Sequence, residues 1–226
     1  KNNKVEFFWI NSYDLNYSHI KKFPSPFDTK NLPKKMISHS KLKQDEKLFF
    51  FDLIDKRISF DYLLGIYLCA FRTDKWNKNL HVINKSLIKD KKPWSNFENT
   101  CFFIKIFCEA FNNSKAYFCA KPLSVNLIGV REWSHLYPLI EIVRIPEAID
   151  YYRSKGLNYY QYWINKNYAL RNFFNYFVKI ILNGDKMGLN YINFRKHFIM
   201  NLVYPYSWLS IVFFFKRKII NLFKAI

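Results

Sequence analysis

The chain has 226 residues, of which 50% are hydrophobic and 20% aromatic, and its formal net charge is +19 at pH 7. This composition excludes an intrinsically disordered chain, because disordered chains lack the apolar surface that drives folding. The length suits one sizeable domain, or part of a domain with an appendage. The charge would attract phosphates, acidic glycans or anionic lipids, but the shared abundance of Lys, Asn, Ile, Phe and Tyr is equally typical of AT-rich genomes. Charge alone therefore does not select a partner.

The first third of the chain predicts a strand, a loop and an ambiguous apolar block. The opening VEFFWINSY is aromatic and β-branched, which predicts a buried strand. The polar, proline-containing stretch 16–47 predicts a long surface loop. The following block, LFFFDLIDKRISFDYLLGIYLCAF, mixes helical and continuous apolar character, so hydrophobic periodicity does not distinguish a helix from a strand there.

The middle of the chain predicts a helix followed by β-structure. The segment SNFENTCFFIKIFCEAFNN has apolar residues at helical spacing and Asn near both ends, so we expect a helix. The next segment, KAYFCAKPLSVNLIG, predicts a strand pair or a strand and a loop, with a break at Lys121–Pro122.

The character changes to basic and aromatic after a soft boundary near Pro146. Gly156 and the turn signal Asn183-Gly184-Asp185 separate three expected helices, at residues 147–155, 157–182 and 191–224. The sequence therefore predicts an α/β fold with two regions, residues 1–145 and a helical, basic C-terminal region of residues 146–226.

The last segment contains an apolar run of only eight residues, Trp208 to Phe215, followed by KRK. A membrane-spanning helix needs ~20 apolar residues, so we do not expect this one to cross a bilayer unaided. It could lie on a membrane surface or be an ordinary docked helix. The four cysteines are embedded in apolar runs and the first residues do not resemble a secretory signal, so we expect a cytoplasmic protein, with the inner membrane face as a further location.

Known nucleotide and metal motifs give no complete site. Neither G-x-x-x-x-G-K-[ST] nor G-x-G-x-x-G occurs. Asp52 and Asp55 in FFDLID are the nearest carboxylate pair for a divalent cation, but their spacing is more typical of a solvated helix edge. We therefore predict no metal ligands in this chain.

Glu98 is the strongest candidate for a catalytic group. It lies in the first turn of the expected helix, where Ser95 or Asn96 could cap and where the helix dipole favours a carboxylate. An ionised carboxylate there could act as a general base toward a hydroxyl group. An acidic residue with only a helix-capping role remains the alternative.

The order of these segments resembles family-two glycosyltransferases of the abequosyltransferase-like group, in the part that follows the nucleotide-binding half. In that group a strand ending in Asn-Ser or Asn-Tyr follows the acidic metal motif, as VEFFWINSY ends here. A segment of the form G…S…FR…W comes next and is matched by Gly65, Cys69, Phe71, Arg72 and Trp76. The next helix begins with an acidic or polar residue, here Glu98, and a later strand AY…PL…V is matched by Ala116, Tyr117, Pro122, Leu123 and Val125. The resemblance covers roughly residues 5–180.

The resemblance implies the acceptor-side, C-terminal portion of a bacterial GT-A-fold enzyme that builds surface polysaccharide such as capsule or lipopolysaccharide. It implies that Glu98 is the base that deprotonates an acceptor hydroxyl for in-line attack with inversion. It implies that Trp76, Arg131 and Trp133 bind substrate. The nucleotide-binding loop and the ligands of the Mg²⁺ or Mn²⁺ ion are expected upstream of Lys1, so this portion alone is not expected to transfer sugar.

The expected partners are a nucleotide-sugar donor, a glycan or lipid-linked acceptor, and an anionic membrane surface. The alternative function is a non-catalytic basic protein that binds nucleic acid or a membrane surface. Nucleic acid is disfavoured, because the positive charge is spread along the chain and no RNP, zinc-finger or helix-turn-helix pattern occurs.

Overall fold

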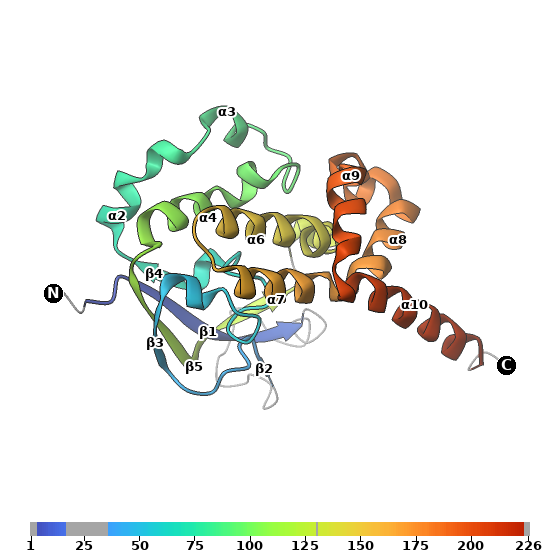
Figure 1. Ribbon diagram of the computed structural model, residues 1–226, viewed down its shortest axis with the longest axis horizontal. Coiled ribbons are helices and arrows are strands. Elements are labelled where there is room, and N and C mark those ends of the chain that lie inside the picture. Colours follow the sequence, from blue (N-terminus) through green and yellow to red (C-terminus); the bar gives the residue numbers. More distant parts are fainter. Residues whose placement is uncertain (1–3, 17–35, 130, 224–226) are drawn as a thin grey trace, which may run out of the picture. The chain divides into compact units, whose positions relative to one another are not determined.

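The computed structural model describes residues 4–16, 36–129 and 131–223 (Figure 1). The chain divides into two compact units, each made of two segments. Unit 1 comprises residues 1–79 and 110–134, and unit 2 comprises residues 80–109 and 135–226. The sequence-based boundary near Pro146 differs from this division, since Pro146 lies in the first turn of a helix and the chain enters unit 2 for the second time at His135.

Unit 1 is built on a five-stranded mixed sheet. Strands β1 (Phe7–Asn16) and β5 (Lys115–Ile128) are parallel at its centre. Three short strands complete the sheet, and all are antiparallel to their partners: β2 (Ile37–Ser38) and β4 (Cys69–Phe71) pair with β1, and β3 (Glu46–Phe49) pairs with β5. The predicted α/β class and the strand at VEFFWINSY are thus confirmed.

The predicted loop at 16–47 is only partly comparable with the structure. Residues 17–35 lie outside the described part of the chain. The remainder of that stretch contains β2 and the first residues of β3, because its backbone completes the edges of the sheet.

The expected break at Lys121–Pro122 is an irregularity within one long strand. On β5 the pairing with β1 passes from Ile10↔Cys119 directly to Ser12↔Ser124, so the extra residues of β5 bulge out of register. Proline lacks the N–H needed for a ladder hydrogen bond and is found at such positions. The chain nevertheless continues as a strand to Ile128.

The ambiguous block forms short elements around a cluster of aromatic rings. It contains the end of β3, 3-10 helices at Phe50–Leu53 and Ile66–Leu68, and β4, and helix α2 (Thr73–Lys78) follows. The rings of Phe50 and Phe111 contact the ring of Phe7 edge-on, at centroid distances of 5.1 and 5.2 Å. The apolar residues of this block therefore reflect packing against the sheet. They do not follow the hydrophobic period of a single helix or strand.

Unit 2 is helical. Its first segment holds a 3-10 turn at Leu80–Val82, helix α3 (Lys85–Ile88) and helix α4 (Phe97–Phe111), whose last two residues belong to unit 1. A 3-10 turn at Glu132–Leu136 leads from unit 1 into its second segment. That segment contains α5 (Tyr137–Leu139), a π-helical turn (Ile140–Arg144), α6 (Ile145–Ser154), α7 (Tyr159–Ala169), α8 (Phe173–Asn183), α9 (Phe194–His197) and α10 (Pro205–Phe223), joined in part by 3-10 turns at Leu170–Asn172, Gly184–Met187, Leu189–Tyr191 and Ile199–Val203. Helix α6 packs against α7, and α8 packs against α10 (Figure 1).

The predicted helices are confirmed in position and differ in continuity. Gly156 and Gly184 separate them with φ of 121° and 60°, values that favour glycine. The predicted helix at 157–182 is two helices, α7 and α8, because the chain tightens into a 3-10 turn at Leu170–Asn172. The predicted helix at 191–224 is interrupted more often, and α10 is its only long piece among residues 191–223.

Within the described ranges, no single helix has both the length and the apolar character needed to cross a membrane. One bent pair, Phe194–Val203 with Pro205–Arg217, meets those criteria jointly, with an angle of 95° between its two parts.

Candidate functional site

The carboxyl ends of the two parallel strands of unit 1 carry interacting polar side chains. Asp14 on β1 lies opposite Asn126 on β5, and the Asn126 Nδ2 atom donates to Asp14 Oδ1 at 3.1 Å. His39, directly after β2, places its Nδ1 atom 3.2 Å from Asp14 Oδ2. Ligand sites in α/β proteins commonly lie beyond the carboxyl ends of parallel strands. This His–Asp pair therefore stands where a binding site is expected.

His39 is buried between two carboxylates. Its side chain is 1% exposed, and its Nε2 atom has no hydrogen-bond partner in the described part of the protein. Burial lowers the pKa of His39, but the hydrogen bond with Asp14 and the nearby charge of Asp61 raise it, with a net increase. Removal from water raises the pKa of Asp61, against the opposing effects of His39 and of the hydrogen bond from Ser59. The cluster therefore favours the protonated form of His39.

Asn11 fixes the loop that carries His39. The Asn11 side chain is buried in β1, and its Nδ2 atom donates to Ala120 O at 2.7 Å and to Ser38 Oγ at 2.9 Å. Its Oδ1 atom accepts from the backbone N–H groups of Ser12 and Ser40, both at 2.9 Å. All its polar atoms are used, so Asn11 joins both central strands to the residues on either side of His39.

The structure brings two sequence-predicted substrate residues together. The Arg131 guanidinium lies 5.1 Å from the Trp133 ring centroid and 5.3 Å from that of Tyr67. Loss of hydration and the charge of Asp61 raise the pKa of Tyr67 to about 12, although Arg131 opposes this. The guanidinium could bind a phosphate or carboxylate group, and the two rings offer apolar faces to the C–H groups of a sugar.

Trp76, the third predicted substrate residue, has one ring face occupied. It lies on α2, and its ring stacks on Phe71 with centroids 5.0 Å apart and planes at 24°. Phe71 in turn contacts the rings of Phe7 and Phe111 in the core of unit 1. Trp76 therefore extends the aromatic core, and its proposed contact with substrate stays a prediction.

Glu98 lies in unit 2, at the start of α4, as expected. The Asn96 side chain accepts from the Asn99 N–H at 2.8 Å and so caps the helix. Glu98 Oε2 is buried and lies 3.1 Å from Lys105 Nζ, although it makes no hydrogen bond of good geometry among the described residues. The backbone leaves helical geometry at Cys101, between these two residues.

Glu98 borders an open cleft of about 490 Å³ within unit 2. The cleft is lined by Leu87, Asn96, Phe97, Glu98, Glu147, Asp150, Tyr151, Ser154 and Lys196. The lining combines carboxylates, an amide, a hydroxyl and an ammonium group with the rings of Phe97 and Tyr151, whose centroids are 6.0 Å apart. Such a mixture can hydrogen-bond to many hydroxyl groups and pack against sugar rings.

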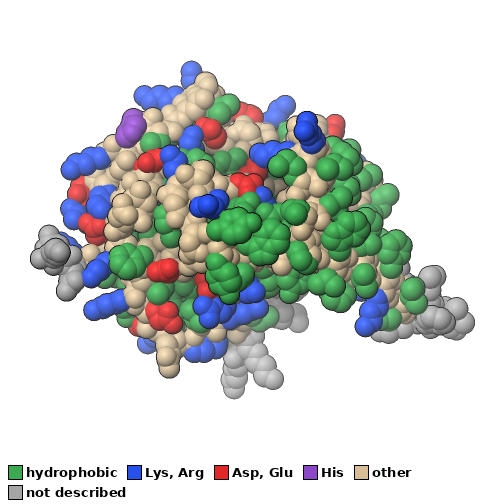
Figure 2. Space-filling view, viewed as in Figure 1, with side chains coloured by type: hydrophobic (Ala, Val, Ile, Leu, Met, Phe, Trp, Pro, Cys, Tyr) green, Lys and Arg blue, Asp and Glu red, His purple; other side chains and the backbone are tan. Residues whose placement is uncertain are grey.

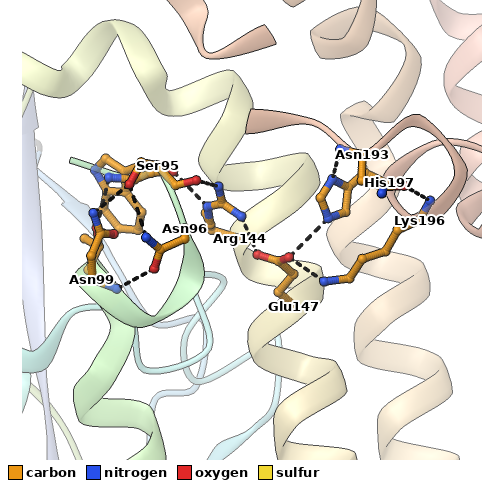
Figure 3. A network of polar contacts seen from close by, with 10 residues as sticks. Ser95, Asn96, Asn99, Arg144, Glu147, Asn193, Lys196 and His197 are labelled. Carbon is orange, nitrogen blue, oxygen red and sulfur yellow. Dashed lines mark hydrogen bonds and ion pairs between the residues drawn. The ribbon is translucent and has the colours of Figure 1, made fainter. Parts of the chain in front are cut away.

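A buried arginine holds the chain segment that leads into α4 (Figure 3). Arg144 donates from Nε to Trp94 O at 2.9 Å and from Nη2 to Ser95 O at 2.7 Å. Its Nη1 atom lies 2.5 Å from Glu147 Oε2. These bonds fix the backbone just before Asn96, and thereby the start of the helix that carries Glu98.

Two cationic side chains and a histidine surround Glu147. Besides Arg144, Lys196 Nζ lies 2.6 Å and His197 Nε2 lies 3.1 Å from Glu147 Oε1 (Figure 3). Burial acts to raise the pKa of Glu147, but His197, Arg144 and Lys196 lower it to about 2. Glu147 is therefore a fixed anion in the wall of the cleft.

Sequence reasoning missed Asn11, His39, Arg144 and Glu147. One signal was available for Arg144: an arginine flanked by Ile142, Val143 and Ile145 must be buried or paired in a helix. His39 and Asn11 carried no comparable signal, since their partners are distant in sequence.

The carboxylate pair considered as a cation site has structural roles. Asp52 Oδ2 accepts from the Phe49 N–H at 3.1 Å, and Asp55 pairs with Arg57. Across the described ranges, no group of three or more His, Cys, Asp or Glu side chains could hold a metal ion.

In comparisons with known proteins, the chain matches no family model, no curated protein and no solved structure.

Proposed function

We propose that this chain forms the acceptor side of a GT-A-type glycosyltransferase resembling family two, which transfers a sugar from a nucleotide-sugar donor to a glycan or lipid-linked acceptor. The observation that carries the proposal is the cleft of unit 2, where Glu98 at a helix N-terminus meets hydroxyl, amide, ammonium and aromatic side chains. A polyhydroxylated acceptor needs this chemistry for binding.

Glu98 is the general base under this proposal. Its Oε2 atom is paired with Lys105, which leaves Oε1 for the proton of an acceptor hydroxyl. As the acceptor oxygen attacks the anomeric carbon of the donor, its proton passes to Glu98. The bond between that carbon and the nucleoside diphosphate breaks, and the diphosphate leaves with the electron pair.

Arg131, Tyr67 and Trp133 form the second binding element of the proposal, in unit 1. A guanidinium can bind two oxygens of a phosphate at once, and rings at 5.1 and 5.3 Å hold it in place. We assign this cluster to a phosphate or carboxylate group of the donor or acceptor.

The family resemblance also implies a Mg²⁺ or Mn²⁺ ion that would neutralise the leaving diphosphate. The described residues do not form a suitable ligand set for it. Every step proposed for this chain therefore uses its own side chains only.

The test is the replacement Glu98→Gln in the natural protein that carries this chain. Transfer of a labelled sugar to lipid-linked and free glycans would be measured at saturating donor. We expect turnover to fall ~10²–10⁴-fold, because a positioned base contributes that much. We expect the thermal unfolding midpoint to change little, since Glu98 makes one partly exposed ion pair.

Glu109→Gln is a matched control. Glu109 lies on the same helix, is 30% exposed like Glu98, and is also paired with a lysine, Lys155. It does not line the cleft. Equal activity of the two variants would contradict the role of Glu98. Absence of sugar transfer by the natural protein toward every acceptor tried would contradict the proposed function itself.

A further inference from the structure

Helix α10 buries two serines and exposes most of the large apolar side chains of its outer side. Ser207 and Ser210 face the interior of unit 2, with exposures of 0% and 3%, and their hydroxyls donate to backbone carbonyls at 2.7 and 2.6 Å. The large apolar side chains Trp208 and Val212 are 57% and 60% exposed. A helix at a water-facing surface normally buries its apolar side, so the outer side of α10 is suited to a non-aqueous environment.

The exposed apolar positions of α10 form one continuous face. At ~100° per residue they occupy a sector about 160° wide. The positions are Trp208, Leu209, Val212, Phe213, Phe215, Ile219 and Ile220. The opposite side packs on α8, where the Phe174 and Phe214 rings meet at 5.3 Å and the Phe174 N–H donates to Ser210 Oγ at 3.0 Å.

Neighbouring elements of unit 2 add further exposed apolar side chains. They are Ile181 and Leu182 at the end of α8, Phe194 on α9, and Ile199, Met200 and Val203 in the turn before α10. Together with the outer positions of α10 we call them the apolar face. Figure 2 shows hydrophobic side chains gathered over α8, α9 and α10. Soluble monomers rarely expose so much contiguous apolar surface.

Charge identifies the occupant of the apolar face. Between Phe173 and Phe223 the sequence has seven Lys or Arg residues and one acidic residue, Asp185. Lys216 lies within the apolar sector of α10 and Arg217 lies beside it, both exposed. A second copy of the chain would bring these positive charges together, which is unfavourable. An anionic lipid surface would neutralise them while the apolar side chains enter the boundary of the acyl chains.

The geometry favours lying on the membrane over crossing it. Helix α10 has 19 residues, and the charged residues after Phe215 interrupt its apolar character. The Trp208 Nε1 atom donates to Leu202 O at 2.7 Å, so its ring can enter the interface without an unpaired N–H group. Tryptophan is enriched at this depth of the membrane.

We propose that the apolar face docks on a lipid bilayer that contains anionic lipids, with α10 lying in the plane of the interface. The proposal does not rest on the glycosyltransferase function, and either can fail without the other.

Flotation with lipid vesicles tests the proposal. The whole chain would be mixed with vesicles of phosphatidylcholine alone, or of phosphatidylcholine with ~30% phosphatidylglycerol. Each mixture would be measured at ~0.1 M and ~0.5 M NaCl, because the higher concentration shortens the electrostatic screening length to a few ångströms. We expect the protein to float with the anionic vesicles, and to bind neutral vesicles or high-salt samples more weakly. Val212→Asp with Phe213→Asp should weaken binding by ~10-fold or more, because two apolar groups no longer enter the interface.

Leu80→Asp with Ile88→Asp is the matched control. It makes the same change in net charge at two exposed apolar positions of unit 2 outside the apolar face, and should bind as the wild type does. Equal binding by both double variants, or no flotation of the wild type with anionic vesicles, would overturn the proposal. So would a stable dimer in lipid-free solution that only the Val212/Phe213 variant disrupts, because a second copy would then cover the face. Circular dichroism would establish that both variants fold.

Discussion

The two units each contain a buried histidine with carboxylates, but the balance of charge differs. In unit 1, the two acidic residues Asp14 and Asp61 surround one histidine, His39, and the pKa values of His39 and Asp61 are both raised. In unit 2, Arg144, Lys196 and the imidazole of His197 surround Glu147, whose pKa is lowered to about 2. In the first cluster, both shifts favour the protonated forms of His39 and Asp61. The second cluster keeps Glu147 ionised in the wall of the cleft.

Of the changes to these two clusters, replacing Arg144 should lower the free energy of unfolding most. Arg144→Met removes the hydrogen bonds to Trp94 O and Ser95 O and leaves buried polar atoms unpaired. We expect a loss of ~3–5 kcal/mol in the free energy of unfolding, measured by urea denaturation. Arg57→Met is the control, because the Arg57 side chain is 61% exposed and its ion pair should contribute only ~0–1 kcal/mol. Similar losses of unfolding free energy in both variants would contradict the expectation that the buried contacts of Arg144 stabilise the fold more than an exposed ion pair.

The pH dependence of Glu147 should be the next largest effect. Its pKa in the folded protein is about 2, below the ordinary value of 4.5, so its contribution is complete above pH 4.5 and is lost as pH falls toward 2. The difference between 4.5 and about 2 corresponds to ~3–4 kcal/mol at ~1.4 kcal/mol per pKa unit. Glu147→Gln should flatten the stability profile in this window, measured by urea denaturation at a series of pH values. An unchanged slope would contradict the charge assignment of the cluster.

His39 should contribute a smaller amount to stability, and its contribution should be lost as pH rises instead of as pH falls. Because its pKa is raised above 6.5 in the folded protein, its contribution is present below pH 6.5 and is lost as pH rises through the higher folded value. Asp14→Asn removes the hydrogen-bonding carboxylate and should lower the His39 pKa, which NMR titration of the histidine ring signals would measure. An increase or no change would show that Asp14 does not determine this shift.

Local patterns predicted those elements whose contacts are close in sequence. The spacing of apolar residues and the asparagines around Phe97–Phe111 indicated α4, and its cap at Asn96 was one of two candidates. The glycines at 156 and 184 marked real turns. The break between α7 and α8 was not visible, because apolar residues continue through Leu170.

Long-range contacts explain what the sequence did not predict. Arg144 and the carbonyl of Trp94 are 50 residues apart, and Asn11 and Ala120 are 109 residues apart. No local pattern indicates such pairs. Arg131 and Trp133 were predicted to bind substrate from the family resemblance alone. Tyr67, which lies beside Arg131 in the structure, belongs to a distant segment.

The parallel pairing of β1 with β5 has a consequence for synthesis of the chain. Ala120, which accepts the Asn11 hydrogen bond, follows Asn11 by 109 residues. At ~5–20 residues per second, β1 leaves the ribosome roughly 5–20 s before its central partner. Among the strands in the described part of the chain, β2 and β4 alone can pair with it during that interval, both on the edge opposite to β5. The nascent strand thus presents an open edge to other chains, and chaperone binding during translation would protect it.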